Sequence, residues 1–377
     1  MDFLGEIWTY TWSFIVVLTI VVFFHELGHY LIARVNGVRV QTFSIGFGRE
    51  LFGLTDRRGT RWKFSAVPLG GYVKMFGDTN PASMPKGEVP SFTPEEEAVA
   101  FTCKRVGQRA AIVSAGPIAN FILAIVLLSI LFVTVGMRVT TPQVSDVVAG
   151  GPAEAAGIEP GDIVLSIAGR DIERFEDMVD IITRNPGVPL EIVVERDETQ
   201  VALSVVPESV AQTDESGGTY EIGRIGVQGS SVIFERQDPA TAVWLGARHT
   251  FIYSFEVLKA VGQMIVGSRS TEELSGPIRI AQFSGEMAKQ GLPNLIFFTA
   301  VLSISLGLIN LFPIPLLDGG HLFFYGIEAA RGRPLGPRAQ EMIFRFGFAV
   351  IVCLVGFVLY NDFRHLGIFD FVENLFS

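Results

Sequence analysis

The sequence predicts a polytopic α-helical membrane protein with four transmembrane helices, a membrane-associated β-hairpin region and an inserted α+β domain. Three features support this fold class. Only 18% of the residues are charged, whereas a soluble domain carries about 25%. The mean hydropathy is +0.41. The apolar residues also gather in four long stretches separated by polar segments, as they do in proteins that cross a bilayer repeatedly.

The four apolar stretches cover residues 12–35, 111–135, 295–311 and 342–360. Their lengths are typical of helices that cross a core of about 30 Å at about 1.5 Å per residue. No Lys or Arg precedes the first stretch, unlike in a cleavable signal peptide, so we expect it to be retained. A further segment, 250–266, mixes Phe251 and Leu258 with Glu256 and Lys259, which predicts an amphipathic helix lying against a surface.

These segments divide the chain into a first membrane half, an inserted domain, an amphipathic region and a second membrane half. The predicted boundaries are 1–137, 138–210, 211–292 and 293–377. In the inserted domain, β-branched runs and turn residues predict a strand at 163–167, a turn at 168–169, a helix at 175–184 and strands at 190–195 and 201–206. This order resembles a PDZ domain of the kind found in bacterial proteases.

Basic residues are distributed unevenly among the loops. Residues 34–109 hold 12 Lys or Arg against 7 Asp or Glu, whereas residues 138–291 hold 12 against 23. Because basic loops stay in the cytoplasm, we expect both termini and the inserted domain outside, and the first and third loops inside. The net charge of −10 argues against a nucleic-acid partner, since a phosphate backbone is bound by clustered Lys and Arg.

A β-rich segment follows the first apolar stretch. Residues 42–48 and 62–67 are strand candidates, and the Pro-Leu-Gly-Gly run at 68–71 predicts a turn that leads into residues 72–75. A hairpin beside the first helix would enter the bilayer only where protein or a cavity surrounds its backbone. A plain cytoplasmic hairpin is the alternative.

The first apolar stretch contains the sequence His25-Glu26-Leu27-Gly28-His29. Histidines at positions i and i+4 share one face of a helix, so both rings can bind one metal ion. Glu26 beside them can act as general base toward water. Ionisable residues inside a membrane are costly unless they serve a function. The alternative is a polar contact between helices.

Two histidines do not complete a catalytic zinc site, which usually has three protein ligands and a fourth position for water. Asp318 is the best candidate for the third ligand. It follows Pro313 and Pro315, which cannot continue a helix and predict an extended segment beside a cavity or a partner. A helix N-cap is the alternative role for Asp318. We expect the nearby His321 to be structural or to support a ligand, because a fourth protein ligand would leave no place for water.

The HExxH motif at 25–29 and the NxxPxPxLDG motif at 310–319 together resemble the site-2 protease family of intramembrane metalloproteases. The four spans and the single PDZ-like insert are similar to the bacterial RseP branch of that family. The resemblance implies peptide hydrolysis, in which Glu26 activates water. It also implies one zinc ion, held by His25, His29 and Asp318.

The same resemblance implies substrate-binding residues on the segment before Asp318. Asn310, Pro313 and Pro315 match the family motif. They would hold the substrate in an extended form. A transmembrane helix hides its amide bonds, so it has to be unwound before water can attack them.

Two further parts of the chain match the family. Gly70, Gly71 and Tyr72 correspond to its membrane re-entrant β-loop, whose exposed edge would stabilise an unwound substrate by backbone hydrogen bonds. The family's Gly-Pro-x-x-Asn signature is matched at 116–120, which implies that Asn120 faces the active site as a further substrate-binding residue. A helix kink with a structural amide is the alternative for Asn120.

The expected activity is the cleavage of membrane proteins within or beside the lipid bilayer. The implied substrates are single-pass membrane proteins, either an anti-sigma factor already cut by a site-1 protease or remnant signal peptides. The expected location is a bacterial inner membrane, with the active site toward the cytoplasm and the PDZ-like domain on the periplasmic side as a size filter. A membrane metal transporter and a catalytically silent PDZ scaffold remain the alternatives.

Overall fold

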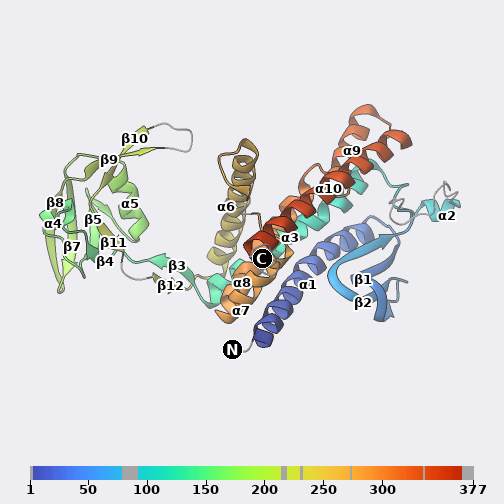
Figure 1. The fold of residues 1–377 in the computed structure, drawn as a ribbon, viewed down its shortest axis with the longest axis horizontal. Coiled ribbons are helices and arrows are strands. Elements are labelled where there is room, and N and C mark those ends of the chain that lie inside the picture. The colour runs from blue at the N-terminus through green and yellow to red at the C-terminus, as the bar shows by residue number, and fades with distance from the viewer. Residues whose placement is uncertain are drawn as a thin grey trace, which may run out of the picture. The chain divides into compact units, whose positions relative to one another are not determined.

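The computed structural model describes residues 3–78, 92–213, 219–229, 232–271, 274–333 and 336–366. The chain forms two compact units (Figure 1). The membrane unit combines Met1–Leu131 with Pro239–Ser377, and the inserted unit is Phe132–Asp238.

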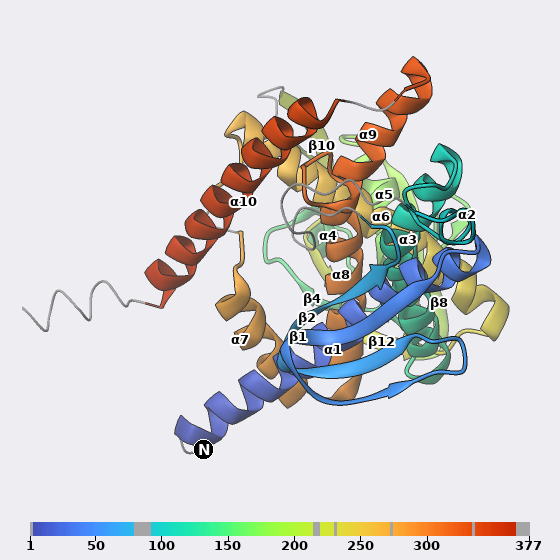
Figure 2. The same ribbon diagram turned by 90° about the vertical axis from the view of Figure 1, so that its right-hand side faces the viewer.

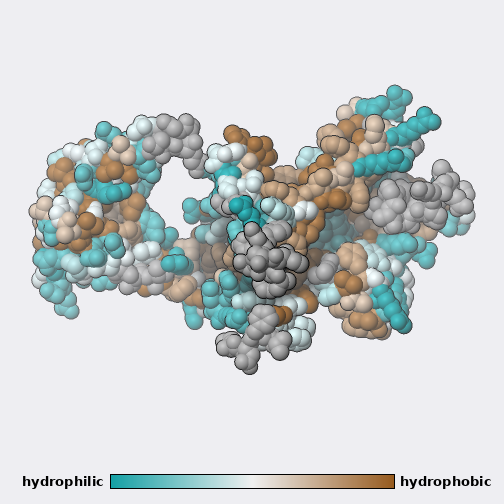
Figure 3. Space-filling model, in the orientation of Figure 1, coloured by the Kyte–Doolittle hydropathy of each residue, from teal (hydrophilic) through white to brown (hydrophobic). Residues whose placement is uncertain are grey.

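Four helices of the membrane unit are long and apolar enough to cross a bilayer. They are α1 (Phe3–Val35), α3 (Val106–Thr134), α8 (Leu292–Leu311) and α10 (Pro337–His365). Each covers one of the predicted apolar stretches to within one residue, so the four predicted spans are confirmed. Apolar side chains that α10 exposes give the brown surface along this helix in Figure 3, as expected of a face that contacts lipid.

Small residues bring α3 close to both α1 and α8. A Cβ atom added to Gly28 of α1 would overlap the carbonyl oxygen of Ala115 on α3. A Cβ atom on Gly307 of α8 would lie 3.2 Å from the carbonyl oxygen of Pro117, also on α3. Small residues allow membrane helices to approach each other closely, so α3 contacts α1 and α8 at neighbouring turns.

The membrane unit contains further helices: α2 (Pro94–Glu97), α6 (Pro239–Val266), α7 (Pro277–Lys289) and α9 (Asp318–Arg331). The predicted amphipathic segment lies in α6, which begins earlier than predicted. Ala242 and Gly246 are buried, and a Cβ atom on Gly246 would lie 2.7 Å from the Ser129 hydroxyl of α3. Trp244 and Phe251 on the other faces are exposed. The small buried face and large exposed apolar residues agree with a helix at an apolar surface.

Helix α7 connects the beginning of α1 with the end of α10. The Lys289 ammonium lies 3.0 Å from the Glu6 carboxylate of α1. At its other end, α7 is capped by Asp362 of α10, which is fully buried. The Asp362 carboxylate accepts the backbone N–H groups of Gly276 and Ile278, each at 2.9 Å. A carboxylate at this place satisfies N–H groups that have no partner within the helix.

β1 (Val40–Thr55) and β2 (Arg61–Met75) form an antiparallel sheet that curls beside α1, as Figure 2 shows. The turn between the strands contains Asp56, whose carboxylate accepts the backbone N–H groups of Arg58 and Thr60 at 2.8 and 2.9 Å. The same carboxylate accepts hydrogen bonds from the Trp62 indole and the Tyr30 hydroxyl of α1. Asp56 therefore fixes the tip of the hairpin to the helix that carries the two histidines.

The predicted turn at residues 68–71 is wrong, because these residues lie inside β2. Gly70 has a φ of +126°, a conformation that glycine adopts easily and other residues rarely. The chain bends at this glycine and continues to pair with β1 beyond it. A Pro-Leu-Gly-Gly run has the composition of a turn, but pairing with another strand keeps it extended here.

The bend in β2 leaves a strand edge near α1. Ile45 of β1 pairs with Gly71 and also with Phe64, so this part of β1 runs between two parts of β2. Residues 71–74 pair with β1 on one side, and no described strand pairs with them on the other. A Cβ atom on Gly71 would lie 3.3 Å from Cγ of Glu26, which places this edge segment beside α1.

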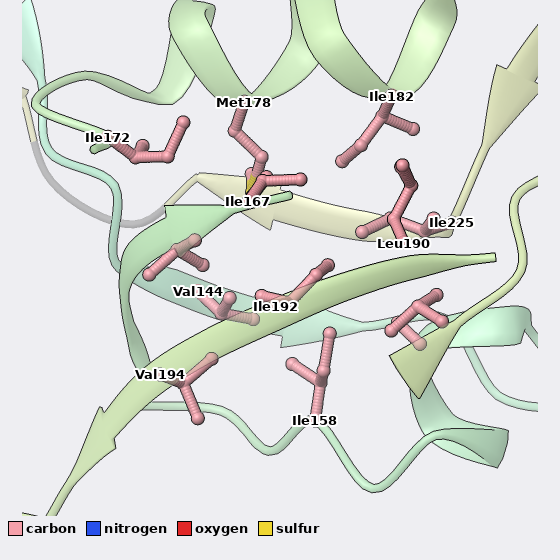
Figure 4. Packing of buried hydrophobic residues seen from close by; sticks show 13 residues of the cluster. Val144, Ile158, Ile167, Ile172, Met178, Ile182, Leu190, Ile192, Val194 and Ile225 are labelled. Carbon is pink, nitrogen blue, oxygen red and sulfur yellow. The ribbon is translucent and has the colours of Figure 1, made fainter. Parts of the chain in front are cut away.

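A four-stranded sheet in the order β6-β5-β7-β8 lies at the centre of the inserted unit. Its strands are β5 (Ile163–Ile167), β6 (Arg170–Asp171), β7 (Leu190–Arg196) and β8 (Thr199–Val205). Helix α5 (Phe175–Thr183) lies over the sheet, and Met178 and Ile182 point from it toward Ile167 and Leu190 in a shared apolar core (Figure 4). The strands and the helix predicted between residues 163 and 206 are thereby confirmed.

Later strands close the inserted unit. β11 pairs with β4, β12 with β3, and β10 with β9. The bounds are β3 (Met137–Thr140), β4 (Val144–Val147), β9 (Glu208–Thr213), β10 (Thr219–Arg224), β11 (Val227–Gly229) and β12 (Val232–Glu235), with the short helix α4 (Pro152–Ala155) after β4. Met137 pairs with Glu235, so the chain enters and leaves the unit through paired strands.

Asp162 is a buried carboxylate in the inserted unit, with an exposed fraction of 1%. Arg196 of β7 donates to it through Nε and Nη2, both at 2.7 Å, and the backbone N–H of Glu159 donates at 2.9 Å. Burial by itself would raise the pKa of Asp162, but these hydrogen bonds outweigh it and hold the pKa below its usual range.

We expect Asp162→Asn to destabilise the inserted unit by about 3 kcal/mol at neutral pH, because it leaves a guanidinium without its buried partner. A carboxylate whose pKa is lower in the folded than in the unfolded protein stabilises the fold at pH values above its unfolded-state pKa of about 3.9. That contribution is lost as the pH falls through the folded-state pKa. Protection of the β5 and β7 amides against hydrogen exchange, relative to the intrinsic exchange rate at each pH, should therefore fall in acid for the wild type and vary less with pH for Asp162→Asn. Asp180→Asn, which changes an exposed pair with Arg184, is the control; an equal effect there would contradict the prediction.

Candidate metal centre and active site

Helix α1 carries both histidines on one face. The two rings meet edge to face with their centroids 4.8 Å apart, and their Nε2 atoms lie 3.3 Å from each other. Both side chains are buried. The i to i+4 spacing alone brings them this close, because residues four apart lie one above the other on a helix.

Asp318 meets the histidine pair from the other end of the chain. It is the first residue of α9 and comes directly after the non-helical residues that separate α8 from α9. Its Oδ2 atom lies 3.2 Å from Nε2 of His25 and 3.4 Å from Nε2 of His29. The structure thus brings together the three predicted ligands, with one donor atom of each within 4.8 Å of the others.

The donor atoms of this cluster fit a metal ion. The Nδ1–H of His29 donates to the Ile112 carbonyl at 2.9 Å, which leaves a lone pair on Nε2. Oδ2 of Asp318 is buried and has no hydrogen-bond partner. Lone pairs directed at one point repel each other unless a cation lies between them. Two imidazole nitrogens and one carboxylate oxygen are a donor set that suits zinc.

Asn120 of α3 supports His25. It is fully buried, and its side-chain amide lies 3.3 Å from Nδ1 of His25. In the structure, Nδ2 of the amide faces the His25 ring, and Oδ1 is then left without a hydrogen-bond partner. Rotation of the amide by half a turn exchanges the two atoms and lets Oδ1 accept the Nδ1–H of His25. Both histidines then use Nδ1 toward α3 and Nε2 toward Asp318.

Gly116 of α3 lies directly against the histidine rings. A Cβ atom at this position would overlap Nε2 of His29 and would lie 2.9 Å from Cε1 of His25. No side chain larger than hydrogen therefore fits without moving a ring. The first residue of the Gly-Pro-x-x-Asn signature provides room for the rings, and the last contacts one of them.

Glu26 lies beside the cluster but is not one of its three donors. Its side chain is directed toward the edge segment, where it contacts Gly71 and interacts with the backbone N–H of Val73. A carboxylate at this place can exchange a proton with water near the cluster while remaining in contact with β2.

The other predicted substrate-binding residues are less closely connected to the cluster. Pro313 is exposed, and Asn310 and Pro315 are half-buried. A Cβ atom on Gly347 of α10 would overlap Pro315, so α10 packs against this segment. The Tyr72 ring stacks on Phe47 with centroids 6.1 Å apart. Among the described residues, no hydrogen bond, ion pair or ring contact joins these side chains to the three ligands, and their roles stay predictions.

His321 lies one turn after Asp318 on α9. Its ring lies 5.7 Å from Phe344 of α10 and 6.5 Å from Tyr325, measured between centroids. It is not among the three residues whose donor atoms converge. Contacts with two aromatic rings agree with the expectation of a structural or supporting role.

The comparison with known proteins covers nearly the whole chain. Residues 13–354 match the model of the family described as peptidase family M50. The chain belongs to peptidase family M50. This membership confirms the resemblance to zinc metalloproteases that the two sequence motifs indicated.

Several relatives are similar over almost their full length. The protein named "Putative zinc metalloprotease R01501" of Rhizobium meliloti is 45% identical over 359 residues, covering 94% of this chain and 96% of its own. Metalloprotease MmpA of Caulobacter vibrioides is 36% identical over 396 residues, covering 97% and 98%. Among solved structures, the PDZ domain of an SdrC-like protein from Listeria innocua matches 24% of this chain and 94% of its own at 22% identity and a TM-score of 0.19.

Sequence reasoning missed three features of the site. These are the Ile112 carbonyl that orients His29, the clearance that Gly116 provides, and an ion pair between Arg109 and Glu328. The signature at 116–120 was recognised as a family match, but its spacing gave no physical reason for the glycine. A backbone carbonyl and an ion pair between distant residues leave no pattern in a single sequence.

Proposed function

We propose that this member of family M50 is a zinc endopeptidase that hydrolyses peptide bonds in the transmembrane segments of other membrane proteins. One observation carries the proposal: His25, His29 and Asp318 converge on one point, and the two histidines lie within a helix that is apolar enough to cross a bilayer. A polar cluster of this kind within a membrane is costly unless it serves a function.

The residues of the cluster have separate tasks. His25, His29 and Asp318 would hold one zinc ion, which as a Lewis acid polarises the scissile carbonyl and makes water more acidic. Glu26 accepts a proton from the attacking water at its carboxylate and passes it to the leaving amine. The backbone of β2 beside Glu26 keeps this carboxylate close to the site without making it a ligand.

The edge segment 71–74 would hold the substrate in an extended form. Its outer edge has no partner strand among the described residues, and Gly71 presents no side chain toward α1. A peptide that adds to a strand edge gains backbone hydrogen bonds, which offset those that a substrate helix loses on unwinding. Asn310, Pro313 and Pro315 would contact the same extended peptide from the segment before Asp318.

For Asn120 we propose a role other than substrate binding. Its full burial and its contact with His25 support a positioning role, in which it orients the imidazole rather than binding substrate. Residues that hold a metal-bound histidine by its other nitrogen fix both its tautomer and its orientation.

The loop charges support one orientation in the membrane. Residues 34–109, with 12 basic residues, would lie in the cytoplasm and the inserted unit outside. We propose a bacterial inner membrane, a site that opens toward the cytoplasm, and single-pass substrates. An anti-sigma factor first cut by a site-1 protease and remnant signal peptides fit this arrangement. The PDZ-like domain would then exclude substrates that still carry a large outside domain.

A reconstituted system tests the proposal. Purified enzyme in vesicles is given one single-pass protein in two forms, with and without its outside domain, and the products are analysed by mass spectrometry. We expect zinc-dependent cleavage within the membrane segment of the trimmed form and at least about tenfold less of the intact form. Cuts confined to parts outside the membrane would contradict intramembrane hydrolysis.

The paired strands at the base of the inserted unit allow a precise test of the filter. Because Met137 and Glu235 are paired, residues 138–234 can be replaced by a short Gly-Ser linker without separating the helices on either side. This variant should cut the trimmed and intact forms equally. Unchanged selectivity would contradict the filter, and zinc flux in the same vesicles without proteolysis would favour a transporter instead.

A further inference from the structure

The end of α8 is in close contact only with the first turn of α9, where a Cβ atom on Gly319 would overlap the carbonyl oxygens of Leu311 and Phe312. Between the two helices, Pro313 and Pro315 lack backbone N–H groups, and Leu316 has a φ of +86°. The connection keeps only short local hydrogen bonds, such as that from the N–H of Leu317 to the carbonyl of Ile314 at 3.0 Å. A segment without regular helical hydrogen bonds fixes the direction of the following helix poorly, so the direction of α9 also depends on contacts further along it.

Besides the ring contacts of His321 and Phe324 with Phe344 of α10, further contacts lie on the face of α9 that begins with Asp318. Leu322 and Tyr325 pack against the apolar cluster formed by α1, α3 and the β1–β2 hairpin. One turn further along this face, the Glu328 carboxylate lies 2.6 Å from Nη2 of Arg109. The spacing of 318, 322, 325 and 328 follows one side of a helix, so the ligand and the ion pair sit at opposite ends of the same face.

Three contacts fix the side chain of Arg109, which belongs to α3. Besides its bond to Glu328, its Nε donates to the Lys104 carbonyl at 3.1 Å, and its guanidinium lies 4.8 Å from the centre of the Tyr325 ring. The side chains of Arg109 and Glu328 are mostly buried, with exposed fractions of 15% and 14%. A buried pair with additional hydrogen bonds has a defined geometry, unlike an exposed one.

We infer that Arg109 and Glu328 are positioning residues that place Asp318 opposite the histidine pair. The same helix, α3, supplies the Ile112 carbonyl to His29 and the Asn120 amide to His25. Through Arg109 it also sets the direction of α9. All three ligands are therefore aligned by one helix that contributes none of them. The inference rests on the proposed function only in taking these three residues as ligands of zinc.

The test measures zinc affinity in the purified full chain by competition with a chelator of known affinity. Glu328→Gln keeps the size of the side chain and removes its charge. We expect it to raise the zinc dissociation constant at least about tenfold, because an unpaired buried guanidinium repositions the helix. The charge exchange Arg109→Glu with Glu328→Arg should restore the constant to within about threefold of the wild type.

Glu341→Gln is the matched control. It makes the same substitution in an exposed i, i+4 pair with Arg345 on α10, and it should leave zinc affinity unchanged. If Glu328→Gln does not fold, Arg109→Lys takes its place, since it keeps the charge but loses the planar group over Tyr325. We expect this variant to weaken zinc binding several-fold.

The outcomes distinguish the positioning role of Arg109 and Glu328 from the proposed function as a zinc endopeptidase. Wild-type affinity in Glu328→Gln, or in Arg109→Lys where that variant replaces it, would overturn the positioning role even if the zinc-free protein melts at a lower temperature. Failure of the charge exchange to restore affinity would also overturn it. A wild-type chain that binds no zinc would overturn the proposed function, and this inference with it.

Discussion

Glu26→Gln is expected to reduce peptide hydrolysis by about 10³-fold, because the amide cannot accept the proton that a general base removes from water. Folding and zinc content should be retained. Glu26 is not one of the three converging donors, and glutamine has nearly the same shape. The measurement is the cleavage rate of a membrane-spanning substrate by purified enzyme whose zinc content has been determined.

Glu6→Gln is the control for this variant. It makes the same change on the same helix at an exposed ion pair with Lys289, far from the cluster along α1, and should cleave at the wild-type rate. Substantial hydrolysis by Glu26→Gln would rule out its role as general base. Loss of zinc in that variant would indicate that Glu26 is a ligand instead.

Gly116→Ala should strongly reduce both zinc affinity and cleavage, although it adds only one methyl group to α3. The new Cβ would overlap Nε2 of His29. The backbone of α3 cannot easily move away, because Ala115 is already in close contact with Gly28. Overpacking of this kind costs about 1–3 kcal/mol. Zinc affinity should therefore fall by up to about 100-fold, and cleavage should fall with it.

The same helix offers a matched control. A Cβ atom on Gly107 of α3 would meet nothing within 4 Å, so Gly107→Ala should bind zinc like the wild type. It should also be slightly more stable, since alanine favours a helix over glycine by about 1 kcal/mol. Equal zinc affinity in both alanine variants would show that the rings tolerate the methyl group and that Gly116 does not set their position.

Local patterns predicted the helical part of the fold well. The four spans and the histidine pair depend on residues that are close in sequence, and the i to i+4 spacing already defines the geometry of His25 and His29. Asp318 was found because two prolines before it mark a break in an apolar helix. The structure brings this carboxylate to the histidines as expected.

Features that depend on distant pairing could not be predicted. The run at 68–71 looked like a turn, because its composition carries no information about the two-sided pairing of Ile45 that keeps it extended. The contact of Asn120 with His25 depends on how α1 and α3 pack, which the local sequence does not specify. Arg109 and Glu328 are 219 positions apart, and nothing in either local sequence indicates the other.

The distance along the chain between His29 and Asp318 has a consequence for biosynthesis. The histidine pair enters the membrane early in translation, whereas the carboxylate emerges only after α8 has been made. Two imidazoles without the third donor make an incomplete zinc site, so a nascent or truncated chain cannot load metal stably. The complete set of three ligands therefore exists only after the start of α9 has been made, so translation itself delays the onset of hydrolysis.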